Sequence, residues 1–440
     1  MIPATGGPPT VGSAVASTEL HADVAVVGGG VIGHGIAWEA RRSGRSVVVI
    51  DDAPGSGASW AAAGMLAPVS ELHYQEEDLL ELMLESSGLW PKFAADLSAD
   101  AAADTGYLAT PTLAIGADAA DRRALMDLCS VQQAHGLDVT PLAVREARNR
   151  EALLSPSISC ALDIPADHQV DPRKLVACLR EALAVHGQDP GSAVPGAMAG
   201  FAVNDRATSL VWEHSRVAGV RLDGGGLVRA KETIVANGMQ AASLGGLPDG
   251  LRLPLRPVYG DILRLRVPEQ LRPLLTATVR GLVHGVPVYI VPRRDGTVVI
   301  GATQREDSLA ASGGSGRNGT AVLAAGVSAG GVYQLLRDAQ VLVPAVAELE
   351  LLESTARARP ATPDNAPLLG RVQLPGSSGQ IDGLIVATGF FRHGVLLTPA
   401  AATICRNLMD GHEDPRWLPF SPARFSGQRN ALTNLTKESA

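Results

Sequence analysis

The sequence lacks the features that mark several protein classes. No apolar run in its 440 residues approaches the roughly 20 that a membrane-spanning helix needs. Lysine and arginine form no cluster and the net charge is −8, so no positive surface for nucleic acid or an anionic membrane is expected. The first 22 residues have neither the basic start nor the apolar core of a signal peptide. We therefore expect a soluble protein with no nucleic-acid or membrane partner.

Cysteine is scarce and scattered. The four cysteines are Cys129, Cys160, Cys178 and Cys405, and no two of them form a CxxC pair. Such spacing argues against a disulfide framework and against a zinc site. The sequence therefore predicts no metal and is typical of a protein in the reduced cytoplasm.

What is present indicates a folded enzyme of about two domains. Hydrophobic residues make up 46% of the chain and charged residues 19%, which is enough apolar material for a large core. A chain of 440 residues exceeds one small domain, so two closely joined domains are expected.

The most informative segment is residues 23–52, where two apolar runs flank a glycine cluster and a helix-like stretch. Gly28, Gly30 and Gly33 have the spacing of a dinucleotide-binding turn: the first permits a tight turn, the second admits a pyrophosphate and the third lets the helix pack on the strand. Asp51 ends the second run, where a carboxylate can accept hydrogen bonds from a ribose. Glycine spacing alone is common in turns, but this context predicts a site for an adenine dinucleotide.

Further along the chain, several segments have the patterns of regular structure. Residues 55–68 are small and nearly uncharged, which suits contact with a flat ligand. The same residues also fit an ordinary alanine-rich helix capped by Ser59. Other expected elements are helices at 79–97, 118–133, from Pro172 and from about Thr398, a strand pair in 106–115, buried strands ending near Gly238 and Gly389, and antiparallel strands from Arg256, Val286 and Thr297.

Five motifs in order make the chain resemble the flavin-dependent D-amino-acid oxidase family, and within it the glycine oxidases of thiamine biosynthesis. They are GGGVIG, SWAAAGMLAP, YIVPR followed by GAT, ARPATPDNAP and TGFFRHGVLLTPA. The resemblance extends from Ala22 to about Phe425. The last motif is the most specific, because it places a glycine, aromatic and arginine cluster around Arg392.

The resemblance implies an α/β fold, α+β overall, with a Rossmann-like FAD-binding domain and an inserted antiparallel β-sheet substrate domain. The FAD-binding domain is then discontinuous. The expected ranges are 22–105, 157–248 and 358–425 for the FAD-binding domain, 106–156 and 249–357 for the substrate-binding domain, 1–21 for a disordered N-terminal tail and 426–440 for a C-terminal tail.

The cofactor that the resemblance implies is noncovalent FAD. Monomeric sarcosine oxidases tether their flavin through a cysteine near the TPDNAP-like segment, but this chain has none there and Cys405 lies well beyond it. The residues carried over to the cofactor site are Gly28, Gly30, Val31, Ile32, Gly33, Asp51, Asp52, Ala58, Ser59, Ala63, Gly64, Met65, Phe390, Phe391, Arg392, His393, Gly394, Val395 and Leu396.

For the substrate, the resemblance implies that Arg359 and Tyr289 bind a carboxylate and that Arg392 lies near the flavin. A guanidinium suits this task because its fork donates two parallel hydrogen bonds. Taken alone, such an arginine is often on the surface and such a tyrosine often packs in a sheet, but the ordered motifs favour function. Two departures, Gln304 for a methionine and Pro287 for a histidine, bear on which side chains the pocket accepts.

The implied reaction is oxidation of glycine, sarcosine or a small D-amino acid by FAD and dioxygen. It yields an imine or glyoxylate with hydrogen peroxide, and the imine can serve thiazole synthesis. No histidine has a pattern that marks a catalytic base. Two alternatives stay open: a D-amino-acid or sarcosine-type oxidase or dehydrogenase with another acceptor, and a non-catalytic FAD-fold binding protein. The resemblance also implies a homo-oligomer.

Overall fold

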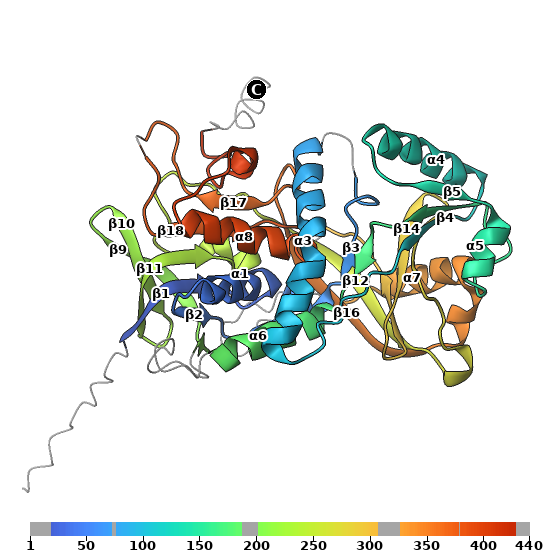
Figure 1. The fold of residues 1–440 in the computed structure, drawn as a ribbon, viewed down its shortest axis with the longest axis horizontal. Coiled ribbons are helices and arrows are strands. Elements are labelled where there is room, and N and C mark those ends of the chain that lie inside the picture. Colours follow the sequence, from blue (N-terminus) through green and yellow to red (C-terminus); the bar gives the residue numbers. More distant parts are fainter. Residues whose placement is uncertain (1–18, 73–75, 187–200, 307–325, 378, 428–440) are drawn as a thin grey trace, which may run out of the picture.

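The computed structural model describes residues 19–72, 76–186, 201–306, 326–377 and 379–427. Two eight-stranded sheets form its framework, and each has its own helices. Figure 1 shows the sheet that contains β1 and β11 on one side of the molecule and the sheet that contains β4 and β14 on the other, with the long helix α3 between them.

The first sheet has a parallel centre. Its main strand order is β17 (Leu368–Arg371), β18 (Leu384–Thr388), β11 (Leu227–Val235), β1 (Glu19–Val27), β2 (Val47–Ile50) and β8 (Ala202–Val203). The strands from β18 to β8 are parallel, while β17 is antiparallel to β18. The hairpin of β9 (Ala207–Glu213) and β10 (Arg216–Leu222) extends β11. The apolar runs of β1 and β2 are buried on both faces, as in other parallel sheets.

Helices cover one face of this sheet. They are α1 (Val31–Arg42), α3 (Glu77–Ala101), α6 (Pro172–His186) and α8 (Thr398–Met409). Side chains along β1 alternate between the two faces of the sheet. Val24 and Val26 pack in the hydrophobic cluster that contains these helices, whereas Ala25 and Val27 belong to the cluster on the opposite face. The parallel sheet therefore holds the start of α1 rigidly above the end of β1.

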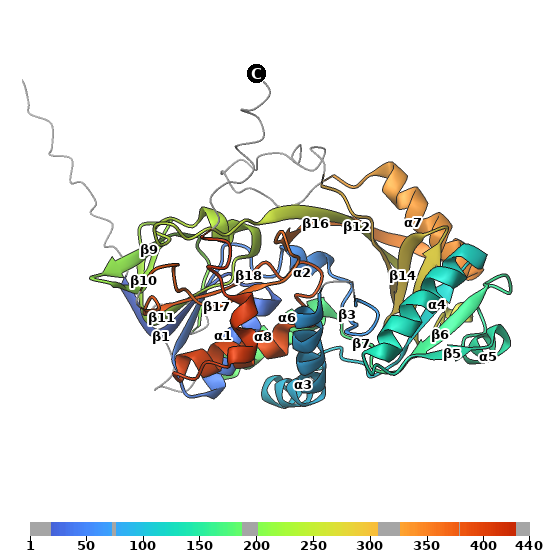
Figure 2. The same ribbon diagram turned by 90° about the horizontal axis from the view of Figure 1, so that it is seen from above.

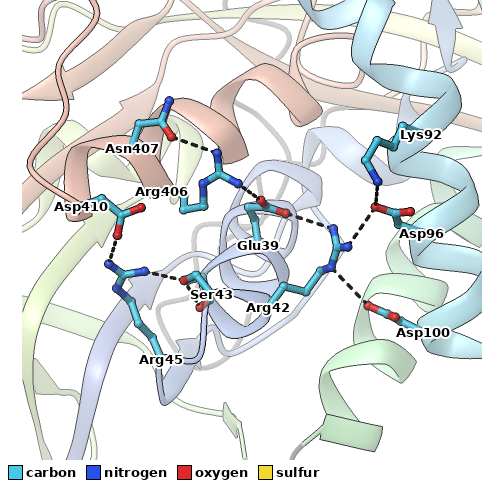
Figure 3. A network of polar contacts seen from close by, with 11 residues as sticks. Glu39, Arg42, Ser43, Arg45, Lys92, Asp96, Asp100, Arg406, Asn407 and Asp410 are labelled. Atoms are coloured by element: carbon cyan, nitrogen blue, oxygen red, sulfur yellow. Dashed lines mark hydrogen bonds and ion pairs between the residues drawn. The ribbon is translucent and has the colours of Figure 1, made fainter.

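Charged side chains link three of these helices at the surface (Figure 3). Arg42 of α1 donates to Asp96 of α3 at 2.9 Å, and Arg406 of α8 donates to Glu39 of α1 at 2.8 Å. Arg45, just after α1, pairs with Asp410. Exposed pairs of this kind contribute little individually, so the buried apolar faces are the main stabilising contact between the helices.

The second sheet is antiparallel except for one pair. Its order is β16 (Glu350–Ala361), β12 (Arg256–Arg266), β15 (Thr297–Gly301), β14 (Val286–Pro292), β13 (Thr278–Val283), β4 (Thr112–Gly116), β6 (Cys160–Ile164) and β5 (Thr140–Leu142). Only β13 and β4 run parallel. Figure 2 shows β12 and β16 as long neighbouring strands that extend from this sheet toward the first.

Alternation along β14 explains why a tyrosine faces inward from this sheet. Val288 and Ile290 pack in the cluster that contains residues of α7 (Ala329–Leu342), which covers the outer face. Tyr289 and Val291 point the opposite way and pack against Ala61 and other small residues that precede β3. The remaining elements are α2 (Ala58–Ala61), β3 (Met65–Leu66), α4 (Ala119–Ala134), α5 (Val144–Arg150), β7 (His168–Gln169), and the 3-10 helices η1 (Gly238–Ser243), η2 (Glu269–Leu271), η4 (Pro344–Glu348) and η5 (Pro415–Phe420).

Most expected elements are present, with two corrections. The helices predicted at 79–97 and 118–133 are α3 and α4, and α6 begins at Pro172. The predicted N-terminal tail 1–21 is wrong at its end, because β1 begins at Glu19 and Leu20 is buried opposite Val228. The predicted strand pair in 106–115 is a single strand, β4, preceded by one isolated bridge at Leu108.

The division into two discontinuous domains stays a prediction. Strand β6 lies within the range 157–248 assigned to the FAD-binding domain, yet it pairs with β4 and β5 in the second sheet. Strand β16 crosses the predicted boundary at 357 and 358. Within the range 249–357 assigned to the substrate-binding domain, residues 307–325 lie outside the described part of the chain.

Candidate active site

A cavity of about 420 Å³ is lined by residues from both sheets. Its wall includes the glycine turn after β1, the small-residue segment around α2, the strands β12, β14 and β16, and the turn between β18 and α8. The structure thus brings residues of all five sequence motifs to one cavity, including Arg359 of the ARPATPDNAP motif.

The glycine turn lies at the N-terminus of α1. Gly28 has a φ of +109°, and a side chain there would overlap the backbone of Ala236 and Asn237. Gly28, Gly30, Val31 and Ile32 line the cavity, but Gly33 does not. A side chain at Gly33 would overlap the carbonyl oxygen of Gly28, so Gly33 is needed for close packing of helix on strand. The helix start, with its positive dipole end, suits a phosphate.

Asp51 sits beside this turn. Its carboxylate accepts hydrogen bonds from the backbone N–H groups of Gly29 at 2.6 Å and Ala53 at 2.7 Å. Burial raises the pKa of Asp51, while the two N–H donors oppose that shift. A carboxylate has about four acceptor sites, so two donors leave capacity for ribose hydroxyls. Asp52 lines the cavity as well.

The small-residue segment 55–68 contains only one turn of helix, α2. Its N-cap is Gly57, so the reading of Ser59 as a helix cap is wrong. The hydroxyl oxygen of Ser59 instead accepts the backbone N–H of Val31 at 3.0 Å, which ties this segment to the glycine turn. The predicted residues here that line the cavity are Ala58, Ser59, Ala63, Gly64 and Met65.

The turn before α8 closes another side of the cavity. Its backbone is held from two directions: the N–H of Phe391 donates to Pro360 at 2.9 Å, and the carbonyl of Leu396 accepts from Trp90 of α3 at 2.8 Å. Phe391 has a φ of +47°, a conformation that only surrounding contacts maintain. The predicted residues that line the cavity here are Phe390, Phe391, Arg392, His393, Gly394, Val395 and Leu396.

Arg359 enters the cavity from β16. Gly260 on the neighbouring strand β12 leaves space for its guanidinium, because a side chain at Gly260 would overlap it. The guanidinium of Arg359 has no hydrogen-bond or ion-pair partner among the described residues, although it lines the cavity. Burial lowers the pKa of Arg359, but an arginine remains charged at neutral pH. The N–H groups of its fork are therefore available to a ligand.

Tyr289 lies close to Arg359 in the same wall. Burial raises the pKa of Tyr289 to about 12, and the charge of Arg359 opposes part of this shift. The phenol is therefore neutral and can donate a hydrogen bond at physiological pH. Gly301, opposite Tyr289 in β15, provides the necessary space, since a side chain there would overlap the phenol oxygen.

Two charged residues in this wall were missed by sequence reasoning. Arg280 of β13 is directly opposite Tyr289 in the sheet and forms an ion pair with Glu71. Arg392 lies 3.6 Å from the same carboxylate through its Nε. Arg280 and Glu71 are 209 positions apart, so no local pattern links them. The one available signal was the β13–β14 hairpin, whose pairing puts residues 280 and 289 on one face.

The cavity near Tyr289 is therefore cationic. Arg280, Arg359 and Arg392 contribute three guanidinium groups, and Glu71 is the carboxylate that contacts two of them. Both departures noted in the sequence, Pro287 and Gln304, also lie in this wall. They can therefore influence which substrate side chains fit.

Other features of the described residues bear on cofactors and location. No group of three or more His, Cys, Asp or Glu side chains lies close enough to hold a metal ion in the part of the chain that the structure describes. The four cysteines are free and buried, and burial raises the pKa of Cys405 to about 12. None of the described helices combines the length and apolarity that crossing a membrane requires.

Comparison with known proteins gives a consistent picture. Residues 23–408 match the family model described as FAD dependent oxidoreductase. The glycine oxidase of Geobacillus kaustophilus is 32% identical over 417 residues, which cover 92% of this chain and 98% of that protein. Its crystal structure superimposes with a TM-score of 0.75 and covers 92% of this chain and 99% of the solved one.

Two further relatives differ in what they contain or act on. The bifunctional protein ThiO/ThiG of Nostoc sp. is 29% identical over 94% of this chain, which spans only 57% of that longer protein. The structure of an iminodiacetate oxidase from Chelativorans sp. is 25% identical with a TM-score of 0.73, covering 91% of this chain and 98% of the other.

Proposed function

Because the chain belongs to the FAD-dependent oxidoreductase family, whose D-amino-acid oxidase motifs it carries, we propose that it oxidises glycine and other small amino acids. The observation that carries this proposal is Arg359, a buried guanidinium with free N–H groups beside the neutral phenol of Tyr289. Both line the cavity that also contains the glycine turn. The similarity to the Geobacillus glycine oxidase supports glycine as the first substrate to test.

FAD fits the residues of this cavity. The glycine turn and the start of α1 would hold its pyrophosphate, and Asp51 would accept hydrogen bonds from the adenosine ribose. The segment from Ala58 to Met65 and the turn from Phe390 to Leu396 would flank the isoalloxazine. We propose a noncovalent cofactor, since Cys405 is buried in α8 and does not line the cavity.

The arginine and the tyrosine would fix the substrate by its carboxylate. A bidentate contact to Arg359 and a hydrogen bond from Tyr289 leave the amino acid few orientations, so that Cα–H can be aimed at the flavin. When bound, FAD supplies the acceptor for that hydride and passes the electrons on to dioxygen. The products are an imine and hydrogen peroxide, and water hydrolyses any released imine to glyoxylate and ammonia.

The excess of positive charge would prepare the amino group. Oxidation needs the nitrogen lone pair, and a like charge nearby disfavours the protonated form of an amine. Arg280, Arg359 and Arg392 would surround the substrate, and Glu71, with Asp167 and Asp261 farther away, offsets part of their charge. The ammonium would therefore lose its proton to solvent on binding, and the protein would need no catalytic base.

The proposed orientation also bears on the stereochemistry. With the carboxylate on Arg359 and Cα–H directed at the flavin, two positions on Cα remain, and the enantiomer that fits depends on which of them holds the amino group. The resemblance to the D-amino-acid oxidase family supports glycine, sarcosine and small D-amino acids over L-amino acids. The resemblance to ThiO/ThiG suggests supply of an imine to thiazole synthesis. A D-amino-acid or sarcosine-type oxidase, or a dehydrogenase with another acceptor, is the second candidate, because Gln304 and Pro287 alter the wall.

The test begins with the absorption spectrum of the purified protein. Acid or heat should release the flavin, and anaerobic glycine should bleach its bands. In air, glycine, sarcosine and D-alanine should release peroxide and L-alanine should not. A bulky D-amino acid preferred tenfold over glycine would favour the D-amino-acid oxidases, and bleaching without peroxide in air would favour a dehydrogenase. No bleaching by any of these substrates would favour a non-catalytic binding protein.

Two variants test the substrate site. Arg359→Met should retain FAD but lose kcat/KM for glycine by tens to thousands of times, because a desolvated charge pair is worth on the order of 2–5 kcal/mol. Arg294→Met is the matched control, since Arg294 is exposed and lies outside the cavity lining. Unchanged turnover in Arg359→Met would assign the carboxylate to another arginine.

We further propose a cytoplasmic homo-oligomer, which size-exclusion chromatography with light scattering would test.

A further inference from the structure

Two arginines of the second sheet lie behind the small-residue segment of the cavity wall. Arg293 follows β14, in the YIVPR motif, and Arg264 belongs to β12. Neither residue lines the cavity, whereas Ala62, Ala63 and Gly64 do. The segment is therefore a single layer of backbone between the cavity and these guanidinium groups.

Both arginines bind carbonyl oxygens of that layer. Arg293 donates through Nη2 to the carbonyl of Ala63, and through Nη1 to the side chain of Gln169 at 2.9 Å and the carbonyl of Val170 at 3.0 Å. Arg264 donates through Nη2 to the carbonyls of Trp60 at 3.3 Å and Ala62 at 3.5 Å. The carbonyl oxygens of residues 62 and 63 are thus turned away from the cavity.

This orientation determines what the wall presents to a ligand. In a trans peptide the C=O and the following N–H point in opposite directions. With the carbonyls of Ala62 and Ala63 directed outward, the N–H groups of Ala63 and Gly64 are directed toward the cavity. Neither of these N–H groups has a hydrogen-bond acceptor among the described residues. They are two donors ready for the acceptor atoms of a flat ring.

The charge of Arg293 is not balanced by a contact. None of the described carboxylates lies within ion-pair distance of it, and its Nε is buried. Burial lowers the pKa of Arg293 to about 10, with Asp171 and Asp295 acting only from farther away, so it is still a cation at neutral pH. A buried cation without a partner is costly. By contrast, Arg264 lies 4.0 Å from Glu353.

We propose that Arg293 is a positioning residue for the cofactor: its fork turns the N–H of Gly64 toward the flavin, and its unbalanced charge favours the reduced, more negative flavin. This inference rests on the proposed function, in which FAD lies along residues 58–65. It names a role for the arginine of the YIVPR motif, which contacts neither the substrate nor the cavity. The role has two parts, hydrogen bonding and charge, which different substitutions separate.

The experiment measures the FAD dissociation constant and the midpoint potential of bound FAD against reference dyes. Arg293→Gln removes both the fork and the charge, so FAD should bind about tenfold more weakly. Its equilibrium constant for reduction should fall about tenfold, which is roughly 30 mV for two electrons. Arg293→Lys keeps the charge but not the fork. It should weaken FAD binding by a similar factor and leave the potential near that of the wild type.

A third substitution, at a residue that contacts Arg293, tests the charge with little change in side-chain shape. Gln169→Glu has nearly the same shape and adds a carboxylate 2.9 Å from Arg293, so it should lower the potential like Arg293→Gln while keeping FAD bound. Arg294→Gln, at the neighbouring exposed position, should change neither quantity. If Arg293→Gln does not fold, Gln169→Glu decides alone.

The outcomes separate this inference from the proposed function. A wild-type potential in both Arg293→Gln and Gln169→Glu would overturn the electrostatic role. A fall in potential in Arg293→Lys as large as that in Arg293→Gln would also overturn it, since geometry alone would then account for the change. A wild-type protein that binds no FAD would instead refute the proposed function, because no potential could be measured.

Discussion

The guanidinium of Arg359 occupies the space above Gly260 where a side chain at residue 260 would lie. The two residues belong to neighbouring antiparallel strands, and Val258 is the direct partner of Arg359 in the register. The position of the proposed carboxylate-binding group therefore depends on a residue of a different strand that has no side chain.

Gly260→Ala should displace Arg359 without disturbing FAD. Overpacking of this kind costs about 1–3 kcal/mol, so kcat/KM for glycine should fall roughly five- to hundredfold. The change should appear mainly in KM, while the FAD content of the purified protein stays the same. Gly88→Ala is the matched control, because nothing lies within 4 Å of the position of the added methyl group. Wild-type kinetics in Gly260→Ala would show that a side chain at residue 260 does not displace Arg359.

Tyr289→Phe should lower kcat/KM without changing its pH profile between pH 6 and 10. Losing one hydrogen bond to a charged group costs about 1.5–3 kcal/mol, or roughly ten- to hundredfold. Burial raises the pKa of Tyr289 to about 12, so the phenol keeps its proton throughout this range. Steady-state kinetics at closely spaced pH values would check this. Disappearance of an alkaline limb in the variant would mean that Tyr289 ionises below pH 10.

Glu71→Gln should increase the affinity of the cavity for simple carboxylates. The substitution keeps the shape of a residue that pairs with Arg280 and Arg392 but removes the negative charge between them. Acetate should therefore bind several times more tightly, as measured by calorimetry or by its effect on the flavin spectrum. Glu77→Gln, on the exposed first turn of α3, is the control. Equal acetate affinity in Glu71→Gln and wild type would exclude this electrostatic role.

The stability of the protein should depend on pH through Asp167. This fully buried carboxylate accepts the N–H groups of Val69 and Ser70, and burial raises its pKa to about 6 from 3.8. The folded state therefore binds more protons than the unfolded state between pH 4 and 6. The stabilising contribution of the protonated group is complete below about pH 4 and is lost as the pH rises through 6.

Urea unfolding at pH 4, 5, 6 and 7 would measure this contribution. The stability advantage of the wild type over Asp167→Asn should shrink between pH 4 and 6, by up to about 3 kcal/mol. Asp249→Asn, at an exposed position, should show a constant difference. A constant difference for Asp167→Asn as well would mean that its pKa is ordinary in the folded protein.

The parts of the site with local patterns could be predicted from the sequence. The residues of the glycine turn lie within six positions of one another, and the strand patterns on either side of it extend over only a few residues. Residues that are close in the sequence are therefore also close in the structure. Of the residues assigned to the cofactor, only Gly33 is absent from the cavity lining, because its task is packing. The roles of the lining residues toward FAD and substrate stay predictions.

What could not be predicted depends on contacts between distant segments. Ser59 follows a pattern typical of a helix cap, but its hydroxyl accepts the N–H of Val31, 28 positions earlier. Glu71 becomes part of the site only because β13 brings Arg280 beside it. Likewise, the sequence around Arg293 predicts only the end of a strand. In the structure, Arg293 donates a hydrogen bond to the carbonyl of Ala63. Local sequence carries no information about such partners.

The cavity wall is contributed by two separate sheets, which allows its two tasks to change independently. The glycine turn and Asp51 follow strands of the first sheet, whereas Pro287 and Gln304 lie on or just after strands of the second. Substitutions at these latter positions can reshape the space around a substrate and leave the contacts to the nucleotide intact. With this arrangement, an enzyme can evolve specificity for new substrates through substitutions in the second sheet, while the cofactor-binding residues of the first sheet stay unchanged.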